Sequence, residues 1–368
     1  MLCPNCGRDN DPNRRTCAFC GTELPSDPVT PPTDPVPKWF RALGAVLRVL
    51  LYVFILMGTQ SCVASGYVMS RISAGGVGVP SIEDATAYSD KFFNFVAETI
   101  ADNITALTLV SGLVAILVVC LLQTIRRRNL PDALMAHSFN PFRIPMLALF
   151  GAALSLFVSI TLSILPLPES LTASLEAEFA PITEADPMLA LISVAVVGGI
   201  IEEIIFRGIA LTRLQKFGNA FAVIVSSVIF GWAHSTVLAG IYAALIGLIF
   251  ASLALKYHSI LPGMVCHIAF NAASLIPIPL SWSVILPLYV ISIAVLILGA
   301  VRIFVRYPTF TDVALDTAGR IPARDETEAR IFARIREIRQ TGDATPEELE
   351  QLRDDWDENA KNRRGKKQ

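Results

Sequence analysis

The stretch Ile201-Glu202-Glu203-Ile204-Ile205-Phe206-Arg207 lies inside an apolar run that extends from about residue 188 to residue 212. A run of this length can cross the hydrocarbon core of a bilayer as a helix. Each charge at the bilayer centre costs about 2.5–3.5 kcal/mol even on the lower scales, because lipid does not solvate it. Two adjacent carboxylates therefore predict a polar cavity between helices, with partner side chains supplied by other segments.

The composition favours an integral membrane protein. The chain has 368 residues, of which 53% are hydrophobic and 17% are charged, and its mean hydropathy is +0.54. These values are too apolar for an ordinary soluble domain. The net charge of −2 gives no indication of a nucleic-acid partner, and none is expected.

Hydrophobic segments of membrane length recur along residues 41–306. Helix is expected in each, because lipid leaves every backbone polar group to be satisfied within the segment. The predicted fold is an all-α, polytopic membrane bundle of about eight transmembrane helices. The break at Ser235-Thr236 is the least marked. The segments are 45–69, 104–125, 145–166, 188–212, 219–236, 237–256, 258–277 and 282–305.

Basic residues mark one side of the predicted membrane domain. The alternate loops, at 70–103 and 167–187, are predominantly acidic. Because Lys and Arg concentrate in cytoplasmic loops, this distribution and the even number of spans predict that both termini are cytoplasmic. The basic residues are Arg8, Arg14, Arg15, Lys38, Arg41, Arg126, Arg127, Arg128, Arg213, Lys216, Lys256, Arg302 and Arg306.

Two CxxC pairs dominate residues 1–23. They contribute Cys3, Cys6, Cys17 and Cys20, a spacing that can arrange four thiolates tetrahedrally around one structural Zn²⁺. The alternative is a redox-active pair of dithiols. This segment resembles the small zinc ribbons at the ends of many prokaryotic membrane proteins, so the expected location is a prokaryotic cell membrane. A closed site of four cysteines leaves no open position for chemistry, which favours docking to a protein partner or regulation.

The segments that flank the predicted membrane domain are polar. Residues 24–40 form a Pro-rich linker, and residues 307–368 form a polar cytoplasmic tail. Within the tail, apolar residues recur on one stripe between Arg324 and Arg339, and Thr345-Pro346 is typical of a helix start. Two short surface helices are therefore expected there.

Three further polar residues fall on later hydrophobic segments: His234, His267 and Asn271. The helical rise places them, with the two glutamates, near the middle of a hydrocarbon core of about 30 Å. His267 and Asn271 lie four residues apart and share a helix face, as do Glu203 and Arg207. Taken singly, each has a structural explanation, such as a hydrogen bond between helices or a Glu–Arg clamp. Together they predict one buried polar site.

The three motifs Glu-Glu-x-x-x-Arg, Phe-x-x-x-His and His-x-x-x-Asn each occupy a separate hydrophobic segment. This combination resembles the CPBP family, which includes the type II CAAX prenyl endopeptidases and the bacteriocin-immunity-type (Abi) proteins. The resemblance covers roughly residues 145–305 and implies peptide-bond hydrolysis in a cavity within the bilayer. It also implies a role for each motif residue. Glu202 would activate the water, and Arg207 would support the carboxylates. The remaining residues would position the water, bind any metal and stabilise the oxyanion: Glu203, His234, His267 and Asn271.

The residue types fit this chemistry independently of the resemblance. A carboxylate can act as a general base, and Asn and His donors can stabilise an oxyanion. His234 and His267 with a glutamate could also hold a catalytic Zn²⁺ that keeps an open position. The family has been interpreted both as metal-dependent and as a metal-free glutamate-type protease, and the sequence leaves both mechanisms open.

The expected function is therefore an intramembrane endopeptidase that acts on a peptide or a protein substrate, which could be prenylated. A non-catalytic immunity or scaffold protein is the alternative. A proton-coupled transporter could use the same carboxylates as a relay. However, no internal repeat or pair of broken helices supports that function.

Overall fold

The computed structural model describes residues 10, 16–17, 23–24, 37–74, 85–126, 130–279, 281–305, 323, 325–341 and 345–365. The chain divides into two compact units. One consists of Met1–Leu43, Ser138–Asn140 and Tyr307–Gln368, and the other of Gly44–His137 and Pro141–Arg306. Regular structure in the described residues is helical apart from one isolated antiparallel bridge between Thr16 and Glu23. The all-α prediction is confirmed.

Six helical stretches of the described chain are long and apolar enough to cross a membrane. They match six of the expected segments. One of them, Pro187–Phe217, is a continuous run of short helical pieces that carries the two glutamates. The others contain α1 (Lys38–Ser73), α3 (Ile104–Ile125), α5 (Ile144–Ile164), α11 (Val237–Tyr257) and α13 (Trp282–Ala300).

The other two expected segments are helical but short. Both α10 (Asn219–Trp232) and α12 (Leu261–Ser274) have 14 residues, fewer than the roughly 20 that span a bilayer. The predicted number of eight spans is therefore not confirmed. The break near Ser235-Thr236 is real, because the Thr236 hydroxyl accepts a hydrogen bond from the Ala239 backbone N–H and caps α11.

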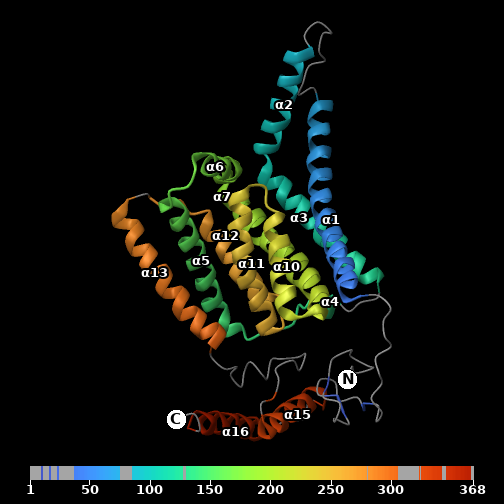
Figure 1. The fold of residues 1–368 in the computed structure, drawn as a ribbon, viewed down its shortest axis with the longest axis vertical. Helices are drawn as coiled ribbons and strands as arrows, with labels where there is room; N and C mark the ends of the chain where they lie inside the picture. Colours follow the sequence, from blue (N-terminus) through green and yellow to red (C-terminus); the bar gives the residue numbers. More distant parts are fainter. Residues whose placement is uncertain are drawn as a thin grey trace. The chain divides into compact units, whose positions relative to one another are not determined.

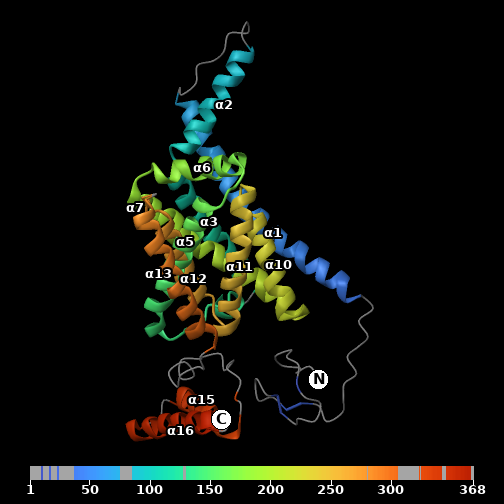
Figure 2. The same ribbon diagram turned by 60° about the vertical axis from the view of Figure 1, so that its left-hand side comes forward.

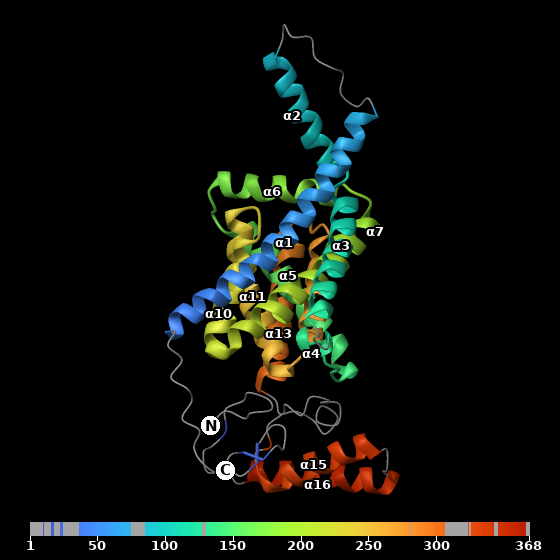
Figure 3. The ribbon, with the colours of Figure 1, turned by 90° about the vertical axis from the view of Figure 1, so that its right-hand side faces the viewer.

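Two of the expected loops, 70–103 and 167–187, contain helices. These are α2 (Ala85–Ala101) and α6 (Glu169–Thr183). Charged and hydroxyl side chains interrupt the apolar residues of both helices, so neither segment was predicted to span a membrane. In the membrane unit, α6 lies across the ends of α5, α11 and α12 (Figure 1 and Figure 3).

The Pro187–Phe217 run forms the centre of the membrane unit. In its most apolar section 56% is buried inside the protein, compared with 11% in the corresponding section of the stretch that contains α13. Around it, α5, α12, α11 and α10 stand side by side in that order (Figure 1 and Figure 2). A Cβ on Gly151 of α5 would lie 2.1 Å from the backbone oxygen of Cys266 in α12. This close approach of small residues is typical of packing between membrane helices.

The described part of the other unit contains a pair of helices, α15 (Glu326–Thr341) and α16 (Pro346–Gly365). They occupy the segments for which tail helices were expected. Ile331, Phe332 and Ile335 pack against Trp356, and Arg334 donates a hydrogen bond to Glu348 at 2.6 Å. The Pro-rich linker lies almost wholly outside the described residues.

Candidate active site

The central run changes its helical form around the glutamates. The π-helices η3 (Leu191–Gly198) and η4 (Ile204–Leu211) flank α8 (Gly199–Glu203), so Glu202 and Glu203 end the short α-helical piece. Wider π turns are uncommon, and they occur frequently at functional sites because they alter the direction of neighbouring side chains. No pattern in the sequence predicted this irregularity.

Glu203 and Arg207 form a buried ion pair. Arg207 Nη1 lies 3.0 Å from Glu203 Oε1, and the side chains are 1% and 0% exposed. The guanidinium also lies over the Phe230 ring, 4.5 Å from its centroid, and Nη2 donates to the backbone oxygen of Gly247 at 3.4 Å. The predicted pairing of these residues four positions apart is therefore present, and the cation gains an aromatic face in addition.

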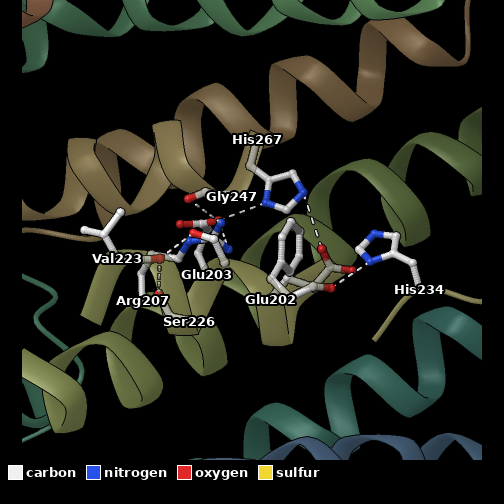
Figure 4. A network of polar contacts seen from close by, with 10 residues as sticks. Glu202, Glu203, Arg207, Val223, Ser226, His234, Gly247 and His267 are labelled. Carbon is white, nitrogen blue, oxygen red and sulfur yellow. Dashed lines mark hydrogen bonds and ion pairs between the residues drawn. The ribbon is translucent and has the colours of Figure 1, made fainter. Parts of the chain in front are cut away.

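His267 joins the two carboxylates. Its Nδ1 lies 3.0 Å from Glu203 Oε1, and its Nε2 lies 3.4 Å from Glu202 Oε2 (Figure 4). The shorter contact is within hydrogen-bond distance, and the longer one is an electrostatic contact. Arg207, Glu203, His267 and Glu202 form one continuous polar chain.

A glycine makes room for the buried carboxylate. A Cβ on Gly263 of α12 would lie 2.7 Å from Glu203 Oε2. Any larger residue would push the carboxylate away from its place beside His267, which lies one turn further along the same helix. The close approach of α12 to the central run thus depends on this glycine.

Glu202 faces a cavity. Its side chain is 30% exposed, whereas that of Glu203 is fully buried. The cavity has a volume of about 410 Å³, and its walls combine apolar residues with a few polar groups. The polar residues that line it are Thr108, Ser159, Glu178, Glu202, His234, Tyr242, His267, Asn271 and Ser274. The cavity thus lies between helices and has polar side chains in its walls, as the adjacent glutamates predicted.

His234 and Asn271 line the same cavity but lie outside the ionic chain. His234 Nδ1 lies 2.9 Å from the backbone oxygen of Phe230, and Asn271 Nδ2 donates to the backbone oxygen of Val194 at 3.3 Å. The structure therefore brings all the predicted residues to one place. Four of them contact one another through charged groups, and two are oriented by backbone carbonyls.

Glu178 and Tyr242 also line the cavity, and the sequence did not single them out. The Glu178 carboxylate accepts a hydrogen bond from the Thr236 hydroxyl at 2.8 Å. Glu178 is one of several acids in an acidic loop, so the sequence does not distinguish it, and its place at the cavity depends on the position of α6.

The sequence predicts a structural metal site in the ribbon and allows a catalytic one at His234 and His267. Among the residues that the structure describes, no group of three or more His, Cys, Asp or Glu side chains could hold a metal ion. Of the four ribbon cysteines, Cys3, Cys6 and Cys20 lie outside those residues. Cys17 is buried, and its sulfur accepts a hydrogen bond from Asn10 Nδ2 at 3.4 Å.

Residues 184–273 match the family model "Type II CAAX prenyl endopeptidase Rce1-like". This Rce1-like region runs through α8, α10, α11 and α12 and contains every predicted catalytic residue. It covers less than half of the chain and is narrower than the region over which the resemblance was expected.

A second family model, a zinc-ribbon domain, matches residues 2–24. No curated protein and no solved structure matched the chain. The Rce1-like region and the six apolar helices support an integral membrane protein with a core of the intramembrane-protease type.

Proposed function

We propose that the chain is an intramembrane endopeptidase in which the Glu202 carboxylate activates a water molecule for peptide-bond hydrolysis. The observation that carries this proposal is the different placement of the two glutamates. Glu203 is fully buried and paired with Arg207, whereas Glu202 reaches the cavity. Only Glu202 can meet both water and a peptide bond.

His267 would hold the Glu202 carboxylate in place. Its Nδ1 is fixed by Glu203, so Nε2 faces Glu202 in a defined orientation. As the general base, Glu202 would take a proton from the attacking water and later deliver it to the leaving amine.

His234 and Asn271, which backbone carbonyl oxygens hold in place, would orient the water and stabilise the oxyanion. His234 Nδ1 must donate to the Phe230 oxygen, since a carbonyl only accepts, so Nε2 of the neutral ring is an acceptor that can orient the water. Asn271 donates one of its two amide N–H groups to Val194 and keeps the second for the developing oxyanion. Both side chains line the cavity that contains Glu202.

The cavity favours a peptide that is neutral or positively charged. Its walls are largely apolar, and Glu178 and Glu202 are the acidic residues among those that line it. None of the described residues lining it is Lys or Arg. A cationic group on the substrate would offset the charge of Glu178, which the Thr236 hydroxyl holds in position.

The cavity lies near the non-cytoplasmic end of the bundle in the orientation that we propose. Its walls include Thr108 near the start of α3, Leu162 near the end of α5 and Ser274 at the end of α12. Basic residues lie at the other ends of these helices and their neighbours, namely Arg126, Arg143, Arg213, Lys216 and Lys256. By the positive-inside rule, substrate would approach from outside the cytoplasm, which disfavours a prenylated cytoplasmic protein.

Cysteine labelling in intact cells tests the side of the membrane. In a Cys62→Ala background, a membrane-impermeant maleimide should label Glu178→Cys from outside the cell and Lys216→Cys only after permeabilisation. Cleavage of a peptide library by protein in liposomes tests the activity itself. Products should be enriched in basic residues near the cleaved bond, and Glu178→Gln should reduce that enrichment. The reverse labelling pattern would refute the proposed side of the membrane. Cleavage products without enrichment in basic residues would refute the proposed preference for a cationic substrate.

We further propose that residues 2–24 bind one structural Zn²⁺ through Cys3, Cys6, Cys17 and Cys20. The buried Cys17 sulfur, which accepts an N–H from Asn10, is placed as a thiolate ligand would be. The short bridge between Thr16 and Glu23 brackets the second CxxC pair. When bound, zinc would supply the folding energy of this small segment and leave it free to dock to a protein partner.

A further inference from the structure

A second cavity lies away from the candidate active site and is lined by basic side chains. It has a volume of about 290 Å³ and is bounded by Ala45, Arg48, Arg126, Arg213 and Lys216. Arg48 comes from α1, Arg126 follows α3, and Arg213 and Lys216 follow η4. Three separate parts of the chain thus bring four cations to one pocket, which we call the basic pocket. None of the described residues lining it is acidic.

One tyrosine fixes two of these cations. The Tyr52 hydroxyl oxygen accepts hydrogen bonds from Arg126 Nη1, from Arg213 Nη2 at 3.2 Å and from Gln123 Nε2 at 3.2 Å. The same ring lies under the Arg213 guanidinium, 4.8 Å from its centroid. Tyr52 is 3% exposed and Gln123 is fully buried, so the arrangement is built into the packing of the helices.

This arrangement gathers positive charge in one pocket. Three N–H donors converge on one hydroxyl oxygen, which has only two lone pairs. Arg48 and Lys216 line the same pocket. A phosphate suits this set of side chains, because it carries negative charge and several strong acceptor oxygens, and guanidinium groups bind it bidentately.

The surroundings indicate where such a phosphate would come from. Leu47 and Leu51 flank Arg48 on α1, and their side chains are 57% and 55% exposed. An acyl chain could lie along these leucines while its headgroup enters the basic pocket. Basic pockets between membrane helices on the cytoplasmic side recognise anionic headgroups, and the pocket lies at the basic ends of the helices.

We propose that the basic pocket binds the phosphate of an anionic phospholipid. The site is separate from the candidate active site and does not depend on the proposed protease activity. Its ligand chemistry is that of a phosphate monoester or diester, and the neighbouring leucines select the lipid form over free phosphate.

Thermal unfolding of the full-length protein in a neutral detergent tests the proposal. Phosphatidylglycerol should raise the midpoint temperature saturably, because a ligand that binds only the folded state stabilises it. Phosphatidylcholine should have little effect, and sodium phosphate at equal concentration should have less effect than the anionic lipid. An equal or larger shift with sodium phosphate would overturn the lipid assignment.

The matched variants are Arg48→Gln/Lys216→Gln and, as a control on the same helix as Arg48, Arg71→Gln. Both pocket residues and Arg71 are exposed, so each variant should fold, and the circular dichroism of the lipid-free proteins checks this. The double variant should bind phosphatidylglycerol at least about tenfold more weakly, as expected for loss of a charge-assisted hydrogen bond. The control should bind like the wild type. Unchanged binding by the double variant, or an equal loss in the control, would refute the basic pocket as the site.

Discussion

His267 Nδ1 lies 3.0 Å from Glu203 Oε1, although 64 residues separate them in the chain. This contact connects α12 to the central run and turns isolated buried charges into one network. A carboxylate buried without partners would be strongly unfavourable, whereas one held by an arginine and an imidazole can persist. The polar chain therefore serves stability and positions Glu202 at the same time.

The Glu203–Arg207 pair should be important mainly for stability. Each of Glu203→Gln and Arg207→Leu leaves the other partner buried, so each should lower the free energy of unfolding by about 3–5 kcal/mol. The double variant Glu203→Gln/Arg207→Leu should lose clearly less than the sum of the two. Denaturant unfolding in detergent measures this. Strictly additive losses would show that the two residues do not stabilise each other.

Gly263→Ala should damage the site by displacing the Glu203 carboxylate. The new Cβ would lie 2.7 Å from Oε2, and overpacking of this kind costs about 1–3 kcal/mol. The loss of turnover should exceed what the loss of folded protein explains, because His267 loses its hydrogen bond to Glu203. Gly66→Ala is a matched control, since nothing lies within 4 Å of a Cβ there. If both variants behave like the wild type, the tight fit at Gly263 is not required.

Much of the site was predictable because intramembrane polar residues are rare. Glu202, Glu203 and His267 stood out against apolar segments, and the spacing of Glu203 and Arg207 indicated their pairing. Glu178 did not stand out, because acids are common in polar loops. The π-helical turns beside the glutamates also left no pattern, since η3 and η4 are as apolar as an ordinary span.

The same reasoning explains the limits of the fold prediction. Hydropathy located every apolar helix of the membrane unit, because burial in lipid requires a continuous apolar run. It overestimated the length of α10 and α12. After α12 the chain continues with the apolar residues Leu275-Ile276-Pro277, so the hydrophobic run extends beyond the end of the helix. It also missed α2 and α6, whose sequences mix polar and apolar residues.

The pair of tail helices should loosen in acid. The Arg334 guanidinium, which donates a hydrogen bond to Glu348, lowers the pKa of the Glu348 carboxyl below its usual range. The stabilisation is therefore complete above the unfolded pKa of about 4.3 and is lost as the pH falls through the lower folded value. The effect should be small, because the pair is exposed to solvent.

Circular dichroism of a peptide covering residues 323–368 measures this loss. Helicity should decrease as the pH falls below about 4, near the reference value for glutamate. In the Glu348→Gln peptide, helicity should decrease less over the same pH range, because no Glu348 carboxylate is left to be protonated. A peptide whose helicity changes identically with and without Glu348 would contradict the assignment to this pair.

The zinc ribbon should be dispensable for hydrolysis. Residues 1–36 precede α1, and a site closed by four cysteines offers no position for substrate. A protein that starts at Pro37 should insert into membranes and cleave the same peptides at a similar rate. Elemental analysis should find one equivalent of zinc fewer than in the full chain. Correct insertion with complete loss of cleavage would give the ribbon a role in activity.

The most direct measurement compares peptide cleavage by the ribbon-deleted protein and by its Glu202→Gln variant, each with and without a chelator. The substitution keeps the volume of Glu202 and removes its charge, so the fold should persist while hydrolysis falls by about 10²–10⁴, as expected for loss of a general base. Chelator sensitivity that zinc restores would assign a metal to the site, and resistance would favour the glutamate mechanism. Cleavage by Glu202→Gln at the wild-type rate would contradict the assignment of the base.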